Sequence, residues 1–141
     1  MAAVELAPGA GGNDLATMMA TTMSQNLEDH PERLGVFARL GGRVAMVAED
    51  ADVSMTMHFE NGRAIMHDGI VGIPDVTMRG GYALLADLSR METGRFGLPD
   101  PKGEVNRAML AALRQGRLRV HGLPTGLPLL ARLGSLLAAA A

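Results

Sequence analysis

The sequence predicts an α+β protein in which helices cover one face of a five-stranded mixed, largely antiparallel sheet. Several segments alternate apolar and polar residues with the two-residue period of strands. Others repeat apolar residues at every third or fourth position, as helices do. The elements are expected in the order α-βββ-β-α-α-β-α, and strands with one polar face favour helices gathered on the other.

The first helix is expected to begin at Asn13 or Asp14, either of which can cap it, and to end at Pro31. Its apolar residues share one face: Leu15, Met18, Met19, Met23 and Leu27. Residues 1–12 are rich in Gly, Ala and Pro and are expected to be a flexible N-terminal lead-in. Residues 13–141 are expected to form a single domain.

Three strands are expected as a meander over residues 43–68. Residues 43–49 are apolar on both alternations, as in an interior strand, and residues 52–60 alternate strictly. Asn61–Gly62 is a strong hairpin signal because both positions accept positive φ. The third strand, over residues 63–68, therefore returns beside the second.

The second half contributes a fourth strand, three helices and a fifth strand. A Gly- and Pro-rich loop over 92–103 is longer than a compact domain usually needs. The expected elements are a strand over 75–79, a helix from Gly80–Gly81 to Met91, a helix over 104–115, a strand over 117–121 and a terminal helix from about Pro128.

The composition limits the class of protein. Hydrophobic residues make up 48% of the 141 residues, which fits a globular chain, and a net charge of −2 gives no reason to expect a nucleic acid partner. No cysteine is present, so disulfides and thiolate metal sites are excluded. The start has no leader pattern, and prolines, glycines and Arg132 interrupt the apolar end, so no membrane span is expected. We expect a cytoplasmic, bacterial protein.

Few residues suggest catalysis. The four histidines lack metal-ligand spacing and no nucleophilic serine motif occurs, so we expect a non-catalytic protein with no cofactor and no metal. An enzymatic role is limited to proton transfer on a bound steroid or polyketide, with Tyr82 or Asp87 as polar groups in an apolar pocket.

Methionine is abundant while aromatic residues are scarce. The chain has 11 Met, no Trp and only 3% aromatics. A sheet face of Met and Val packs less uniquely than one of Phe and Trp, and a space left there would accept an apolar guest. The alternative is that the same side chains close on one another as an ordinary core.

The C-terminal stretch "RLRVHGLPTGLPLLARLGSLL", residues 117–137, is apolar with basic residues before and within it. Its leucines occupy more than one face of the expected helix, so some of them should contact something other than the sheet. Two interpretations are possible: a movable lid over a ligand site, or a homodimer contact through residues 123–137. Arg114, Arg117, Arg119 and Arg132 favour transient contact with an anionic membrane. The alternative is that these arginines lie on a solvated face of the sheet and form ion pairs with nearby carboxylates.

Three stretches resemble the sterol carrier protein type 2 family of lipid-binding domains. They cover about residues 36–137 and are "FARLGGRVAMVAEDADVSMTMHFENGRAIMHDG" (37–69), "IPDVTMRGGYALLADLSRM" (73–91) and "ALRQGRLRVHGLPTGLPLLARLGSLL" (112–137). The resemblance implies a five-stranded sheet with helices on one face and an apolar tunnel between them. It implies a fatty acyl, acyl-CoA, sterol or isoprenoid ligand and no catalytic residue. The loop over 92–103 looks longer than the family's link.

The expected function is therefore binding and transfer of an apolar lipid without catalysis. The alternative is a scaffold for lipid or isoprenoid-quinone metabolism that uses the apolar C-terminal helix for assembly. The residues expected to line the ligand site are Met46, Met55, Met57, Phe59, Val76, Met78, Leu88, Met109, Leu113, Leu118, Leu130 and Leu133.

Overall fold

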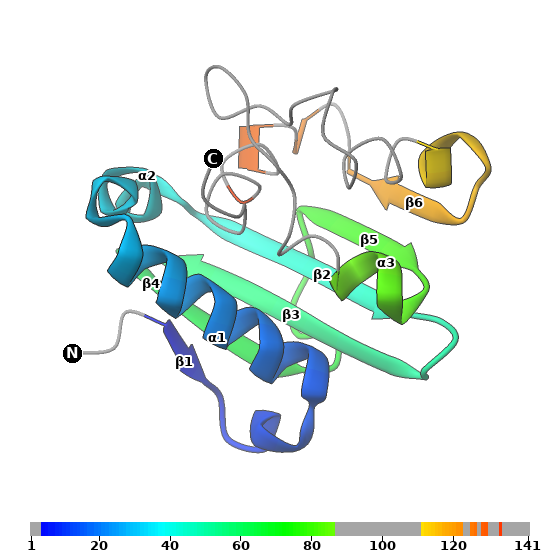
Figure 1. Cartoon of the computed structure of the whole chain (residues 1–141), viewed down its shortest axis with the longest axis horizontal. Helices are drawn as coiled ribbons and strands as arrows, with labels where there is room; N and C mark the ends of the chain where they lie inside the picture. Colours follow the sequence, from blue (N-terminus) through cyan, green and yellow to red (C-terminus); the bar gives the residue numbers. More distant parts are fainter. Residues whose placement is uncertain (1–3, 87–110, 123–124, 127, 130–132, 134–141) are drawn as a thin grey trace.

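The computed structural model describes residues 4–86, 111–122, 125–126, 128–129 and 133 (Figure 1). They form one mixed sheet of six strands in the spatial order β1-β4-β3-β2-β5-β6. The strands are β1 (Val4–Leu6), β2 (Gly42–Ala48), β3 (Val53–Glu60), β4 (Arg63–Asp68), β5 (Val76–Gly80) and β6 (Leu118–His121). The pairs β1–β4 and β2–β5 are parallel, and the other three pairs are antiparallel.

Helices lie against one face of this sheet. They are α1 (Asp14–Asp29), α2 (Leu34–Arg39) and α3 (Tyr82–Ala86), with 3-10 turns η1 (Ala10–Gly12) and η2 (Pro31–Arg33). In Figure 1, α1 and α3 are on the same side of the strands. The α1 helix contacts β1, β4 and β3, whereas α3 contacts β2 and β5, so the two helices divide the face between them.

The start of α1 is fixed by the cap that the sequence offers. The Asn13 side chain accepts a hydrogen bond from the backbone N–H of Ala16 at 3.0 Å, which satisfies one free donor of the first turn. Four of the five predicted apolar residues of this helix are buried, and Met18 is half-buried against the core.

The predicted meander is confirmed. Asn61 and Gly62 have φ of 51° and 73°, and Glu60 pairs with Arg63, as in a two-residue hairpin. Residue alternation then sorts the faces, because successive side chains of a strand point to opposite sides. Met55, Met57 and Phe59 face the helices, while Thr56 and His58 face away.

The expected number of strands is corrected from five to six. Val4–Leu6 forms a sixth strand in parallel register with Ala64–Met66, and Val4 is buried under α1. A three-residue strand has too few residues to show an alternating pattern, so its pairing depends on the free edge of β4. The backbone N–H of Ala7 continues the pairing by donating to the carbonyl of Met66 at 2.9 Å.

Much of the predicted second half lies outside the described residues. This holds for the loop over 92–103, for most of the helix over 104–115 and for most of the terminal helix. Residues 111–114 and 128–129 are helical, in agreement with the predicted positions. The short strand β6 confirms the predicted fifth strand and ends the sheet beside β5.

Candidate functional site

The helix-facing side of the sheet is a continuous apolar surface built largely from methionine. In the register of the strands, Met46 lies between Met55 on β3 and Met78 on β5. Met57 lies beside Val44 and opposite Met66 of β4. Cross-strand neighbours on one face have Cβ atoms about 4.5–5.5 Å apart, so these thioether side chains share a single layer.

The α1 helix closes this layer from the other side with methionines of its own. Met19 and Met23 have no exposed surface, and Leu15 and Leu27 flank them on the same helical face. All four belong to the same buried cluster as the sheet residues. The resulting layer contains little aromatic bulk, with Phe37 and Phe59 as its buried rings among the described residues.

The structure brings together most of the residues that the sequence predicted as ligand-lining. Seven of them are buried, at most 4% exposed, on the helix-facing side of the sheet: Met46, Met55, Met57, Phe59, Val76, Met78 and Leu118. Leu133 is also buried at 1% exposure and belongs to the same cluster. Leu113, in contrast, is 43% exposed. Leu88, Met109 and Leu130 lie outside the described residues.

Sequence reasoning omitted several members of the layer. Met19, Met23 and Met66 are as deeply buried as the predicted residues. The signals were present, since Met19 and Met23 follow the helical spacing and Met66 follows the strand alternation. Val4 carried no such signal because β1 is only three residues long.

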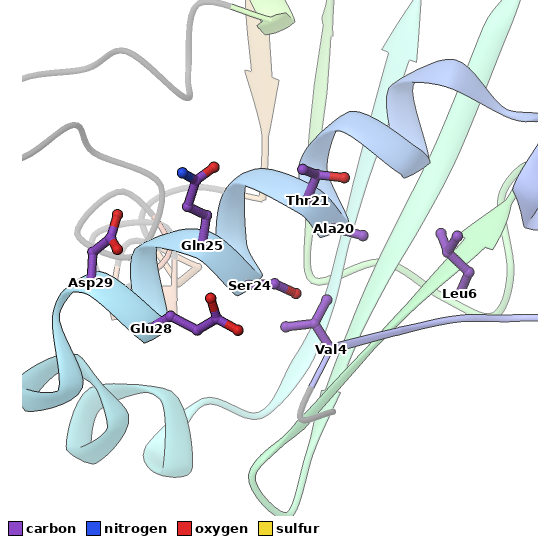
Figure 2. A pocket seen from close by; sticks show the side chains of 8 residues that line it. All are labelled: Val4, Leu6, Ala20, Thr21, Ser24, Gln25, Glu28 and Asp29. Atoms are coloured by element: carbon purple, nitrogen blue, oxygen red, sulfur yellow. The ribbon is translucent and has the colours of Figure 1, made fainter. Parts of the chain in front are cut away.

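The described residues form surface pockets that include two without any predicted ligand residue in their lining. One, of about 540 Å³, lies beside β1 and the polar side of α1. In Figure 2, Val4, Ser24 and Glu28 approach one another across it. The other, of about 340 Å³, lies where Gly42 and Asp75 meet Leu129. The predicted tunnel between the layers stays a prediction.

The face of the sheet away from the helices is polar. His58 and His67 lie there with ring centroids 6.4 Å apart. Burial, followed by the neighbouring His58 and Arg43, lowers the pKa of His67 below its usual value. Within the described part of the chain no group of His, Asp and Glu side chains is arranged to hold a metal ion.

The arginines predicted to contact a membrane have different surroundings. Arg119 forms an ion pair with Glu49, as the solvated alternative supposed, and Arg117 donates to Gln115 at 2.7 Å. Arg114 is exposed, and Arg132 lies outside the described residues. Over the residues that the structure describes, no helix is long and apolar enough to cross a bilayer.

The enzymatic alternative gains no support from Tyr82. Its backbone N–H donates to Asp50 at 2.8 Å, and its half-buried side chain packs against the core. Asp87, its expected partner, lies outside the described residues.

Comparisons with known proteins were made at three levels. No protein-family model and no curated protein sequence matches the chain. Among solved structures, the stereoselective inverting sec-alkylsulfatase Pisa1 from Pseudomonas sp. matches with a TM-score of 0.52 and 15% identity, over 77% of this chain and 14% of that chain. The chain therefore resembles one small part of that enzyme.

Two further solved structures are similar over most of both chains. A protein described as a UbiJ-SCP2 ubiquinone synthesis protein has a TM-score of 0.49 and 19% identity over 86% of this chain and 85% of its own. A crystal structure of sterol carrier protein 2 has a TM-score of 0.49 and 15% identity, over 87% and 95%. Such identities concern the fold alone. The strands and helices of the structure itself confirm the predicted fold class, because the chain has an α+β fold with a mixed sheet.

Proposed function

We propose that this protein binds an apolar lipid between its sheet and its helices and carries it without catalysing a reaction. The observation that carries the proposal is the methionine layer, which joins α1 to four neighbouring strands. Its methionines, among the described residues, are Met19, Met23, Met46, Met55, Met57, Met66 and Met78.

Methionine suits a layer that must open for a guest. Its unbranched side chain has three rotatable bonds, so it can change rotamer and keep its contacts where a ring or a β-branched side chain cannot. Each methylene of a ligand removed from water contributes about 0.8 kcal/mol, so ten to twelve give roughly 8–10 kcal/mol before the costs of association. Micromolar affinity needs about 8 kcal/mol, which a long acyl chain supplies without an ion pair.

The buried polar groups favour a ligand with an apolar body. Asn13 and Thr56 are the buried polar residues of the described part of the chain. Both already hydrogen-bond within the protein, so neither offers a free partner to a buried head group. The Thr17 hydroxyl of α1 is an exception, because it is buried without a hydrogen-bond partner among the described residues. One hydroxyl is a small polar complement, so chain length and shape of a lipid would decide most of the specificity.

Lipid binding can be tested with two variants that fill space in the methionine layer and with one control variant. Met46→Phe and Met57→Phe put a rigid ring into the layer, while Ile65→Phe puts the same ring on the opposite face through β4. We expect the first two to lower the affinity for a fluorescent fatty acid about tenfold, because overpacking costs about 1–3 kcal/mol. The control should bind like the unmodified protein.

Native mass spectrometry of the purified protein separates this function from its alternative. A co-purifying acyl or prenyl lipid supports the carrier. A lipid-free dimer that binds no fluorescent fatty acid and dissociates when residues 123–137 are changed would overturn it in favour of a scaffold. In that case the apolar C-terminal segment would serve protein assembly.

A further inference from the structure

The connection between β4 and β5 crosses the sheet on the face that has no helices. The strand order places β3 and β2 between β4 and β5, so residues 69–75 must pass over both. In Figure 1 this connection passes behind the strands, on the side away from α1. It runs over Thr56 and Arg43, whose side chains alternate with the helix-facing Met55, Met57 and Val44.

Five hydrogen bonds fix this connection to the sheet, one of them from the Arg43 backbone N–H to the Asp75 carboxylate at 2.9 Å. The Thr56 hydroxyl donates to the carbonyl of Gly69 at 2.8 Å and accepts from the N–H of Val71 at 3.0 Å. The N–H of Gly69 donates to the Ser54 carbonyl and that of Asp75 to the Arg43 carbonyl, each at 2.9 Å. The segment is therefore held in one arrangement at both ends and in the middle.

Gly72 lets the connection lie close to the Arg43 side chain. It has a φ of +75°, and a Cβ there would come within 2.7 Å of the Arg43 Nε. The large outward side chains of the same connection are aliphatic, and its one carboxylate, Asp75, is exposed and accepts a hydrogen bond from the Arg43 backbone N–H. Ile70 is 48% exposed, Val71 39% and Ile73 87%. The sequence thus places three large apolar side chains in water on a short, firmly anchored segment.

Two arginines lie on this face of the sheet, Arg43 directly under the connection and Arg79 on β5. The buried Nε of Arg43 has no hydrogen-bond partner, and within the described part of the chain neither Arg43 nor Arg79 has an acidic partner. Arg79 also lies directly opposite Arg119 on β6, whose own ion-pair partner is Glu49. The carboxylates of Glu49 and Glu5 on this face are already paired, with Arg119 and Arg63.

We propose that this face docks on an anionic lipid bilayer, with Ile70, Val71 and Ile73 entering the interface and Arg43 and Arg79 contacting lipid phosphates. A protruding aliphatic tip flanked by cations fits a fluid, negatively charged surface, whereas stable protein interfaces are centred on aromatic anchors in concave pockets. The inference is independent of the proposed lipid site, because the connection lies on the opposite side of the sheet.

Co-flotation with vesicles tests this surface, using phosphatidylcholine vesicles with and without phosphatidylglycerol. We expect the unmodified protein to bind the anionic vesicles. Ile73→Ser should weaken binding about tenfold, since a buried isoleucine contributes about 1.5–3 kcal/mol. Arg79→Gln should weaken it about fivefold, since a basic residue near such a surface contributes about 1 kcal/mol. Thr56→Val, which removes the central anchor but keeps the side-chain shape, should also weaken it.

Two matched controls make the result specific. Leu34→Ser removes an aliphatic side chain of similar exposure, 47%, from α2 and should leave binding unchanged. Arg114→Gln removes an exposed arginine remote from the connection in sequence and should have a smaller effect than Arg79→Gln. Equal binding of Ile73→Ser and unmodified protein, or no binding to anionic vesicles, would overturn the proposal. So would a protein dimer that Ile73→Ser dissociates, because a second copy would then occupy this face. Fatty acid binding in solution should be the same for all loop variants.

Discussion

Asn13 and Asp68 are joined by a hydrogen bond of 2.8 Å from the amide Nδ2 to the carboxylate Oδ1, across 55 positions of sequence. The same amide donates to the Ser54 carbonyl at 2.7 Å, while its oxygen caps α1. One buried side chain therefore starts the helix and attaches it to two strands.

Replacement of Asn13 should destabilise the fold. Asn13→Ala removes the cap and leaves the Ser54 carbonyl without its side-chain donor, so we expect the free energy of unfolding to fall by about 2–3 kcal/mol in urea titrations. Asn13→Asp keeps the cap but sets a second carboxylate against Asp68, and should also destabilise near neutral pH. Thr21→Ala, on the exposed side of α1, is the control and should change little; an equal loss there would contradict the assignment.

Gly122 should not tolerate a side chain. Its φ is +102°, and a Cβ would overlap the carbonyl oxygen of Asp75 at the start of β5. We expect Gly122→Ala to lower the free energy of unfolding by more than about 2 kcal/mol, since strain and overlap add. Gly116→Ala is the matched comparison, with a φ of +74° and open space around its Cβ, and should cost only about 1 kcal/mol. Thermal unfolding of both variants tests this prediction. Similar losses of stability in the two variants would show that overlap with Asp75 is unimportant.

The pH dependence of stability should contain a contribution from His67. Its pKa is lowered from 6.5 in the folded protein, so the unfolded chain binds this proton more readily. The stabilisation is fully present above pH 6.5 and is lost as the pH falls through the lower, folded pKa. Urea titrations from about pH 8 to pH 5 should therefore show a smaller decline for His67→Gln than for the unmodified protein. His121→Gln, an exposed residue of β6, should keep the original slope.

A bound lipid should partly restore the stability that is lost when a side chain of the methionine layer is shortened. Met55→Ala removes a fully buried side chain from the centre of β3 and should cost about 2–5 kcal/mol, whereas Met55→Leu should cost less than about 1.5 kcal/mol. If the layer admits an acyl chain, a long-chain fatty acid should raise the melting temperature of the alanine variant more than that of the leucine variant. Equal increases would contradict binding within this layer.

The fold was predictable where the local pattern and the tertiary pairing agree. Asn13, the alternation of β3 and the Asn61–Gly62 turn each give one strong local signal, and the structure has each as predicted. The strand β1 was missed because three residues show no period. Its existence depends on β4 offering an unpaired edge, which is information from elsewhere in the chain.

The candidate site was predictable as a set of positions but not as a cavity. Alternation identifies which strand residues face the helices, and the predicted sheet residues are buried together there. A cavity between the layers depends on side-chain rotamers and on the distance between the helices and the sheet. The periodicity of the sequence predicts neither. The exposed aliphatic residues of 69–75 were also missed, because the pattern alone assigns them to a connection and not to a surface.

The short strand β1 has a consequence for how this protein avoids self-association. Without it, β4 would border the sheet with a six-residue row of free amide and carbonyl groups, an open template for other chains. With it, the outermost strand is only three residues long, and Glu5 and Arg63 bring charges to this edge. A segment too short to be recognised in the sequence thus protects this edge of the sheet from pairing with strands of other molecules.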